Sequence, residues 1–238
     1  VEITPSFADA KGRIEVSLQM ESRPRSQGMY LVSAIQLSVP ESARAEYEKG
    51  RLKLTINDRT RAANHFRKAV DIAPQFSAAW YQLGWHALQE KHFQDAVTHF
   101  REALKYLPDN YRALLNLGGA LLMLDDAAEA AAVTERAVRA RPDDAEARVQ
   151  LGQSLMMIGR LDEAEEQLKK AVSLDPANYY FPQILLAEIY HRRSDYASMA
   201  GQLEEFLRLH PDYAKAREVA RLLSEIRAQM RKGLASTP

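Results

Sequence analysis

The chain has 238 residues, of which 46% are hydrophobic and 27% are charged, a composition typical of a folded protein with a substantial core. Lysine plus arginine number 32, as do aspartate plus glutamate, so the chain as a whole has no net charge that would attract nucleic acid or an anionic membrane. Cysteine is absent, which excludes disulfides, thiolate metal sites and a cysteine nucleophile. No apolar run approaches the roughly 20 residues that a membrane-spanning helix needs.

Residues 1–40 are β-leaning. Ile14, Val16, Leu18 and Met20 alternate with polar residues, and this period of two indicates a half-buried strand. We expect either a hairpin that packs on the segment that follows or the remnant of a larger β domain, because a two-stranded hairpin is only marginally stable alone. The chain begins at Val1 and not at a methionine, so we expect a mature or partial form in which any signal peptide is missing.

A pattern of 34 residues repeats through most of the remaining chain. It is clearest in residues 77–108, where two helical stretches are separated by a break at Lys91 and His92. The marked positions there are Trp80, Leu83, Gly84, Ala87, Ala96, Phe100, Ala103 and Pro108. Prolines recur every 34 residues, at positions 74, 108, 142 and 176. The proline at the corresponding place in the last unit, at 211, follows after 35 residues.

This W-x2-L-G…A-x3-F…P pattern resembles the tetratricopeptide repeat (TPR) family over residues 43–213. The resemblance implies a mainly α fold, a right-handed α-solenoid of about five helix-turn-helix units. In register, the units would be 43–76, 77–110, 111–144, 145–178 and 180–213. After them, apolar residues at helical spacing predict an amphipathic capping helix over 214–231, and we expect a disordered tail at 232–238.

Small residues recur in phase within these units. The eighth residue is Gly50, Gly84, Gly118 and Gly152 in the first four units, and the twentieth is an alanine in each of them. Since glycine costs about 1 kcal/mol inside a helix, its recurrence indicates a steric requirement. We expect the eighth residue, on the first helix, to face the twentieth, on the second helix, where a larger side chain would push the two helices apart.

The resemblance also implies where a ligand would bind. In the TPR family the first helices of the units line a concave groove, mainly through positions two, five, six, nine, twelve and thirteen. On this sequence, the groove residues so implied are Tyr47, Arg51, Tyr81, Trp85, Leu88, Arg112, Leu115, Asn116, Leu122, Met123 and Met156.

The centre of this predicted groove is apolar. Leu115 and Leu122 would face water unless a partner's helix or the chain's own residues 1–40 covered them. In that case we expect Trp85→Ala and Leu122→Glu to weaken partner capture without unfolding the chain. The alternative is that the twist of the array tucks these side chains between neighbouring helices, and the sequence leaves both interpretations open.

Patterns for catalysis and for metal binding are missing from the sequence. The six histidines form no H-E-x-x-H pair and no i,i+4 pair for zinc, and there is no G-x-S-x-G motif and no P-loop. We therefore expect no catalytic residues, no metal site and no cofactor.

We predict a non-catalytic scaffold that binds a protein partner, as a peptide or an amphipathic helix, in the groove, with no nucleic-acid partner. The alternative is a structural module that homo-oligomerises through the N-terminal β segment or the terminal repeats. The junction at residues 35–49 also resembles bacterial exported proteins in which a carboxypeptidase-regulatory-like β-sandwich precedes TPR units. That resemblance implies a bacterial extracytoplasmic location, while a cytoplasmic one stays open.

Overall fold

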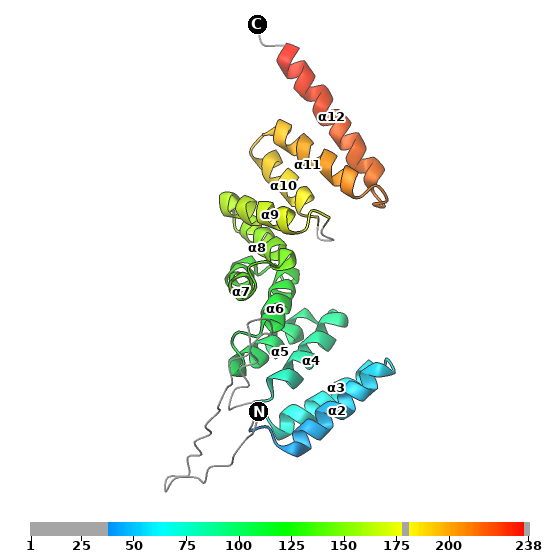
Figure 1. The fold of residues 1–238 in the computed structure, drawn as a ribbon, viewed down its shortest axis with the longest axis vertical. Helices are drawn as coiled ribbons and strands as arrows, with labels where there is room; N and C mark the ends of the chain where they lie inside the picture. Colours follow the sequence, from blue (N-terminus) through cyan, green and yellow to red (C-terminus); the bar gives the residue numbers. More distant parts are fainter. Residues whose placement is uncertain (1–37, 178–180, 236–238) are drawn as a thin grey trace, which may run out of the picture. The chain divides into compact units, whose positions relative to one another are not determined.

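The computed structural model of the chain describes residues 38–177 and 181–235, with the side chains of residues 38–177 and 181–231. The strands predicted within residues 1–40 fall outside this range. In the part of the chain that the structure describes, all regular secondary structure is helical, in eleven helices (Figure 1). For these residues the structure confirms the mainly α fold.

The helices follow one another through short connections. Their bounds are α2 (Glu41–Thr55), α3 (Arg59–Ile72), α4 (Ser77–Gln89), α5 (Phe93–Tyr106), α6 (Tyr111–Met123), α7 (Ala127–Ala140), α8 (Ala145–Met157), α9 (Leu161–Leu174), α10 (Pro182–Arg192), α11 (Tyr196–Leu209) and α12 (Ala216–Ala235).

Consecutive helices pack in pairs, and the pairs stack. The closest packing joins α2 to α3, α4 to α5, α6 to α7, α8 to α9 and α10 to α11, while the second helix of each pair packs on the first helix of the next. This arrangement is a solenoid of helix pairs, as the repeat pattern predicts. Each pair therefore buries its apolar face mainly against its immediate neighbours.

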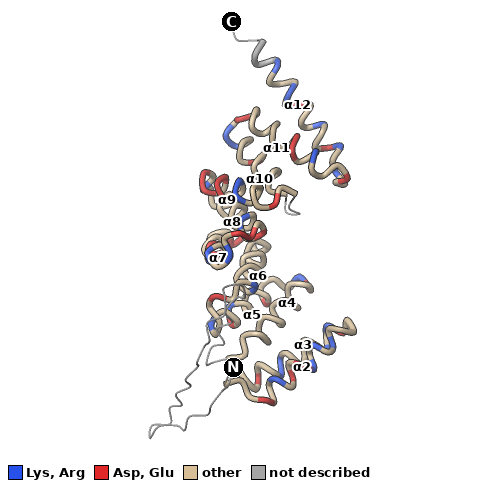
Figure 2. The backbone as a smooth tube through the Cα atoms, viewed as in Figure 1, with Lys and Arg blue, Asp and Glu red and all other residues tan. Residues whose placement is uncertain are grey.

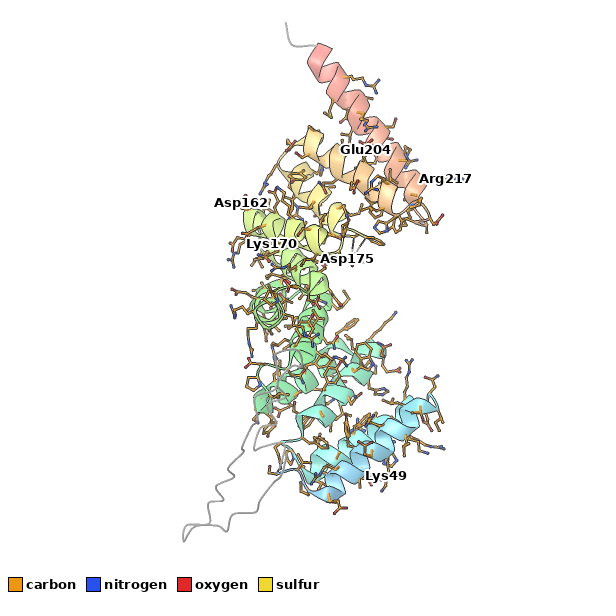
Figure 3. The ribbon with its side chains drawn as sticks, in the orientation of Figure 1. Lys49, Asp162, Lys170, Asp175, Glu204 and Arg217 are labelled. Atoms are coloured by element: carbon orange, nitrogen blue, oxygen red, sulfur yellow. The ribbon has the colours of Figure 1, made fainter. Side chains whose placement is uncertain are left out.

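The last helix, α12, packs on α11 through Leu223 and Ile226, which are 7% and 5% exposed. Glu204 of α11 also accepts a hydrogen bond of 2.6 Å from Arg227 of α12 (Figure 3 labels Glu204). The helix continues to Ala235, so the expectation that a disordered tail starts at residue 232 is wrong for residues 232–235. Gly233 weakens a helix by about 1 kcal/mol but does not by itself end it.

The turn inside each pair has the same backbone geometry in all five described pairs. The fifteenth residue of each unit adopts a left-handed conformation with φ between 57° and 80°, and these residues are Asn57, Lys91, Asp125, Gly159 and Ser194. A residue in this conformation turns the chain so that the backbone N–H of the next residue donates to a carbonyl of the preceding helix. An example is the 3.0 Å bond from Asp126 N to Leu121 O. The turn is therefore closed by the backbone, and only one of the five positions is a glycine.

The residue after each left-handed position precedes the second helix, and it is an aspartate in three of the five described pairs. Asp58, Asp126 and Asp195 each accept a hydrogen bond from the backbone N–H three residues on. These side chains satisfy one of the free donors at a helix N-terminus. His92 and Arg160 occupy the same position and give no such bond.

Recurrent glycines on the first helices set the distance within each pair. A Cβ placed on Gly50 or Gly84 would lie 2.6 or 2.7 Å from the ring of Phe66 or Phe100, and one on Gly152 would lie 2.7 Å from Leu168 Cγ. The steric requirement is thus present. The nearest group belongs to the twenty-fourth residue of the unit, while the expected twentieth residue is a more distant neighbour, as at Gly152, where Ala164 O lies 3.4 Å from the Cβ position.

Side-chain donors tie successive pairs together at the proline that ends each unit. In the four described junctions the proline carbonyl accepts a hydrogen bond of 2.6–2.9 Å from a side chain of the next unit. The bonds run from Trp80 to Pro74, from Arg136 to Pro108, from Arg148 to Pro142 and from Gln183 to Pro176. A proline therefore ends a helix and also exposes a carbonyl that orients the next pair.

The junction between α9 and the α10–α11 pair is the most polar one that the structure describes, and it centres on Glu165. Its carboxylate accepts a hydrogen bond of 2.7 Å from Tyr190 and lies 2.6 Å from Lys169 Nζ. Arg193 also binds Glu165 and reaches Asp162, which Figure 3 labels on α9. Burial of the carboxyl raises its pKa, but hydrogen bonds from Lys169, Tyr190 and Arg193 outweigh burial and bring the pKa of Glu165 to about 2.

Two neighbouring glycines of α6 provide a matched test of the close approach within a pair. A Cβ on Gly118 would lie 2.3 Å from Thr134 Cγ2, whereas one on Gly119 would lie 3.6 Å from Gln150 Nε2, an ordinary contact. We expect Gly118→Ala to destabilise the fold by about 1–3 kcal/mol and Gly119→Ala to stabilise it by up to about 1 kcal/mol. Urea unfolding followed by circular dichroism measures both changes.

A second substitution identifies the clash. Thr134→Ser removes the Cγ2 that the new methyl group meets and keeps the hydroxyl that donates to Ala130 O at 2.7 Å. In the Gly118→Ala background it should recover part of the lost stability. Equal effects of the two alanine substitutions, or no recovery, would contradict the steric account.

The Glu165 cluster predicts a stability that depends on pH. Its pKa is about 2 in the folded chain and 4.5 ordinarily, so its contribution is fully present above about pH 4.5 and disappears as the pH falls towards 2. We expect the gap in thermal midpoint between the wild type and Glu165→Gln to narrow over that range. Glu166→Gln, which removes an exposed pair with Lys170 on the same helix, is the control and should change the midpoint little. A gap that stays constant from neutral to acidic pH would rule out this linkage.

Candidate functional site

The residues that the sequence places in a groove all lie on the first helices of successive pairs. Tyr47 and Arg51 belong to α2, Tyr81, Trp85 and Leu88 to α4, Met156 to α8, and the remaining five to α6. In the solenoid, α4 contacts α6, α6 contacts α8 and α8 contacts α10, so these helices form one continuous layer (Figure 1). The structure therefore brings the predicted residues of α4, α6 and α8 onto one layer of adjoining helices.

A hydrogen bond links two predicted residues across neighbouring pairs. Asn116 Nδ2 of α6 donates to the hydroxyl of Tyr81 on α4 at 3.1 Å. Burial raises the pKa of the Tyr81 hydroxyl, while the positive charge of Arg112 and the bond from Asn116 act in the opposite direction. The hydroxyl is therefore protonated at neutral pH, and since its oxygen already accepts from Asn116, its proton remains available to donate.

Part of the predicted apolar surface is open to solvent. Trp85 is 41% exposed and Met123 is 59% exposed, while Leu88 is half-buried. Met157, which ends α8, the first helix of the following pair, is 44% exposed. Large side chains of this kind, held on rigid helices, are suitable anchors for a partner's apolar groups.

Three predicted residues do not form a surface. Leu115, Leu122 and Met156 are 8%, 7% and 3% exposed, and all three belong to the apolar core clusters of the stacked pairs. The expectation that Leu115 and Leu122 would face water is therefore wrong. The alternative interpretation applies, because α6 packs against helices on both sides and the stacking tucks these side chains between neighbours.

Charge on this layer is uneven. Arg51 pairs with Glu48 on its own helix, at 3.1 Å. Arg112 is exposed and forms no ion pair within residues 38–177 and 181–231. Figure 2 shows lysine and arginine on α2 and α3 beside acidic residues. Arg112 is thus a cation near Tyr81 that a ligand's acceptor could use.

Gln150 of α8 stands at the sixth position of its unit, one of the groove positions that the family resemblance implies. Its amide lies against the two glycines of α6, with Nε2 3.6 Å from the position of a Cβ on Gly119. Its Oε1 is buried and has no hydrogen-bond partner among the described residues. Amide-bearing side chains occupy this sixth position in three successive units: Gln82, Asn116 and Gln150.

Two hollows that the structure describes lie away from the predicted groove residues. One, of about 330 Å³, is lined by residues of the α11–α12 connection together with Ala177 and Phe181, and the other by Asp109, Arg136, Arg139 and Ala140. Among the described residues, no group of three histidine, aspartate or glutamate side chains could hold a metal ion. Nor does any described helix have the length and apolar character to cross a bilayer.

Comparison with known proteins identifies the repeat. Models of the tetratricopeptide repeat match residues 47–95, 81–143 and 124–189, which together make up more than half of the chain. No curated protein matches the chain.

Several solved structures have a similar fold. MamA from Desulfovibrio magneticus RS-1, residues 41 to the end, is 25% identical with a TM-score of 0.67, covering 74% of this chain and 99% of that one. YrrB, described as a TPR protein with an unusual peptide-binding site, is 23% identical with a TM-score of 0.69, covering 79% and 98%. A tetratricopeptide repeat protein from Parabacteroides merdae ATCC 43184 is 16% identical with a TM-score of 0.68, covering 82% and 77%.

The burial of Leu122 changes what a charge there should do. Leu122→Glu would place a carboxylate in the core without a partner and should lower the stability by several kcal/mol, unlike the expectation from sequence. Met123→Glu, at the neighbouring and exposed position, should change it by no more than about 0.5 kcal/mol. Thermal unfolding followed by circular dichroism compares the two. Similar midpoints for both variants would mean that Leu122 is not part of the core.

Proposed function

Because the chain belongs to the tetratricopeptide repeat family, we propose that it is a non-catalytic scaffold that binds a peptide or an amphipathic helix of a protein partner on its first helices. The units 43–76, 77–110, 111–144, 145–178 and 180–213 serve as the frame of this surface, with the segment 214–231 as its cap. Proteins of this family are typically non-catalytic interaction modules, which supports a binding role over an enzymatic one.

The observation that carries the proposal is the exposed Trp85 on the same helix as Tyr81 and its bond to Asn116. Trp85 is 41% exposed, next to the half-buried Tyr81 and Leu88 on the same helix. Tryptophan, tyrosine and arginine provide most of the binding energy in protein interfaces. All three types occur here, as Trp85, Tyr81 and Arg112. Large apolar area next to fixed donors favours a ligand with both apolar side chains and acceptors.

The contact residues that we propose are the exposed or half-buried members of the predicted set. They are Tyr47, Arg51, Tyr81, Trp85, Leu88, Arg112, Asn116 and Met123. Leu115, Leu122 and Met156 form the floor beneath them and act on binding only through the packing of α6 and α8. The resemblance to YrrB, which is described as having a peptide-binding site, supports a peptide as the ligand.

The exposed residues on successive first helices favour an elongated ligand. A small molecule is normally held in a concave cavity that buries most of its surface. A helix or an extended peptide instead uses a row of anchors along adjoining elements. Trp85 on α4, Met123 on α6 and Met157 on α8 provide such a row, one from each of three successive first helices.

We expect Trp85→Ala to weaken peptide binding at least about tenfold, because it removes a large anchor at the centre of the surface. The measurement selects binders to the full chain from a displayed library of random peptides and then titrates the selected peptides, by calorimetry, against the variants. The control is Tyr196→Ala, which removes an aromatic side chain of similar exposure, 39%, from the start of α11.

The results separate the alternatives. Peptides that bind Trp85→Ala and Met123→Glu as tightly as the wild type would remove this surface from consideration. The alternative of self-assembly is tested by sedimentation velocity on the same samples. A chain that stays monomeric at tens of micromolar argues against it, whereas concentration-dependent oligomers without any selected peptide would favour it over the scaffold.

A further inference from the structure

The connection between α2 and α3 exposes apolar side chains at the end of the first helix pair. We define residues 51–61 as the first tip. Leu52 is 65% exposed, Ile56 is 66% exposed and Leu54 is 38% exposed. A few exposed apolar residues are normal on any protein, but here Leu52 and Ile56 lie one helical turn apart and are both strongly exposed, and Leu54 adds a third exposed side chain at the same end of the hairpin.

The same eleven residues are strongly basic. They contain four cations, Arg51, Lys53, Arg59 and Arg61, and a single acidic residue, Asp58. Asp58 is occupied, since it caps α3 through Arg61 N at 3.2 Å and pairs with the Arg61 side chain. Lys53 and Arg59 form no ion pair within residues 38–177 and 181–231. Lys49, one turn earlier on α2 and labelled in Figure 3, is paired with Glu46 at 2.6 Å and so adds no unpaired charge to the first tip.

The corresponding segments of the other units lack this combination. In residues 153–163, Met157 and Ile158 are exposed, at 44% and 38%, but the segment has one basic and two acidic residues. In residues 119–129, Met123 and Leu124 are exposed beside three acidic residues and no basic one. Among the five described connections of this type, the first tip alone joins an apolar patch to an excess of cations.

The backbone of the first tip is also suited to an apolar environment. Asn57 N donates to Leu54 O at 3.0 Å and Asp58 N to Lys53 O at 2.9 Å, and the Thr55 hydroxyl donates to Leu52 O. These bonds satisfy part of the turn's hydrogen-bonding groups from within the chain. Unsatisfied backbone groups oppose the placing of a turn among lipid chains, and each internal bond reduces that cost.

We propose that the first tip docks on the surface of a membrane that contains anionic lipids. Leu52, Leu54 and Ile56 enter the boundary between headgroups and acyl chains, and Lys53 and Arg59 bind the lipid phosphates. Insertion of apolar side chains together with electrostatic attraction is the usual basis of interfacial binding. A lipid surface fits better than a protein groove because the patch is convex and its unpaired charges share one sign. The residues proposed to contact lipid, Leu52, Lys53, Leu54, Ile56 and Arg59, are not among the proposed peptide contacts.

The test is co-sedimentation of the full chain with vesicles of phosphatidylcholine alone or with about 30% phosphatidylglycerol. We expect binding to the anionic vesicles only, and weaker binding when the salt is raised from about 0.1 M to about 0.5 M. Leu52→Ser/Ile56→Ser should reduce binding at least about tenfold, because two inserted side chains are lost. Lys53→Gln/Arg59→Gln should reduce it by a similar factor on the anionic vesicles.

The control is Met157→Ser/Ile158→Ser, which removes an exposed apolar pair, 44% and 38% exposed, from a segment with a net negative charge; its vesicle binding should not change. Circular dichroism verifies that all variants keep the helical fold.

Failure of the wild type to bind anionic vesicles overturns the proposal, as does equal binding by the tip variants and the control. It is also overturned if binding is lost only on Arg217→Gln/Arg221→Gln, which would place the contact on α12. If the tip substitutions change self-association but leave vesicle binding unchanged, the first tip is a protein contact, and this result also overturns the proposal.

Discussion

The architecture depends on one close approach, repeated along the chain. In the first four helix pairs a glycine of the first helix leaves room for a large or branched side chain of the second: Phe66, Phe100, Thr134 or Leu168. With a methyl group in that place, the two helices could not come together at the same distance and angle. Because each pair stacks on the next through the faces that this angle creates, the approach also decides where the first helices lie and which residues they expose.

The junctions between pairs use polar contacts as well as apolar burial. Proline carbonyls accept bonds from tryptophan, arginine or glutamine side chains of the following unit, so one structural task is done by chemically different residues. Between α9 and α10 the Glu165 cluster adds charged hydrogen bonds. Since each pair contacts only its neighbours, stability in such an array is approximately a sum of local terms. A change at one junction should therefore act mainly on the pairs beside it.

Two surfaces of different chemistry result from this stacking. The layer of first helices presents Trp85, Tyr81 and Arg112 on rigid elements, a mixture suited to a peptide with apolar groups and acceptors. The first tip instead presents aliphatic side chains next to Lys53 and Arg59, two cations with no ion pair among the described residues, which suits a flat anionic surface. The residues whose substitution separates the two, Trp85 and Leu52, lie on different helices and both are exposed, so each surface can be altered without removing the other.

The sequence by itself determined the family, the positions of the helix pairs and the need for glycine at the eighth position. These follow from local periodicity, from prolines and small residues at fixed spacing, and from steric limits that hold in any packed helix pair. It also located Tyr81, Asn116 and Trp85 on the helices that carry them. Only the tertiary structure decided that the glycines face the twenty-fourth residue, that Leu115, Leu122 and Met156 are buried, and that Leu52 and Ile56 are exposed. The reason is that burial depends on the angle between stacked pairs, which is set by contacts between residues about 34 positions apart and has no signature in the pattern of a single helix.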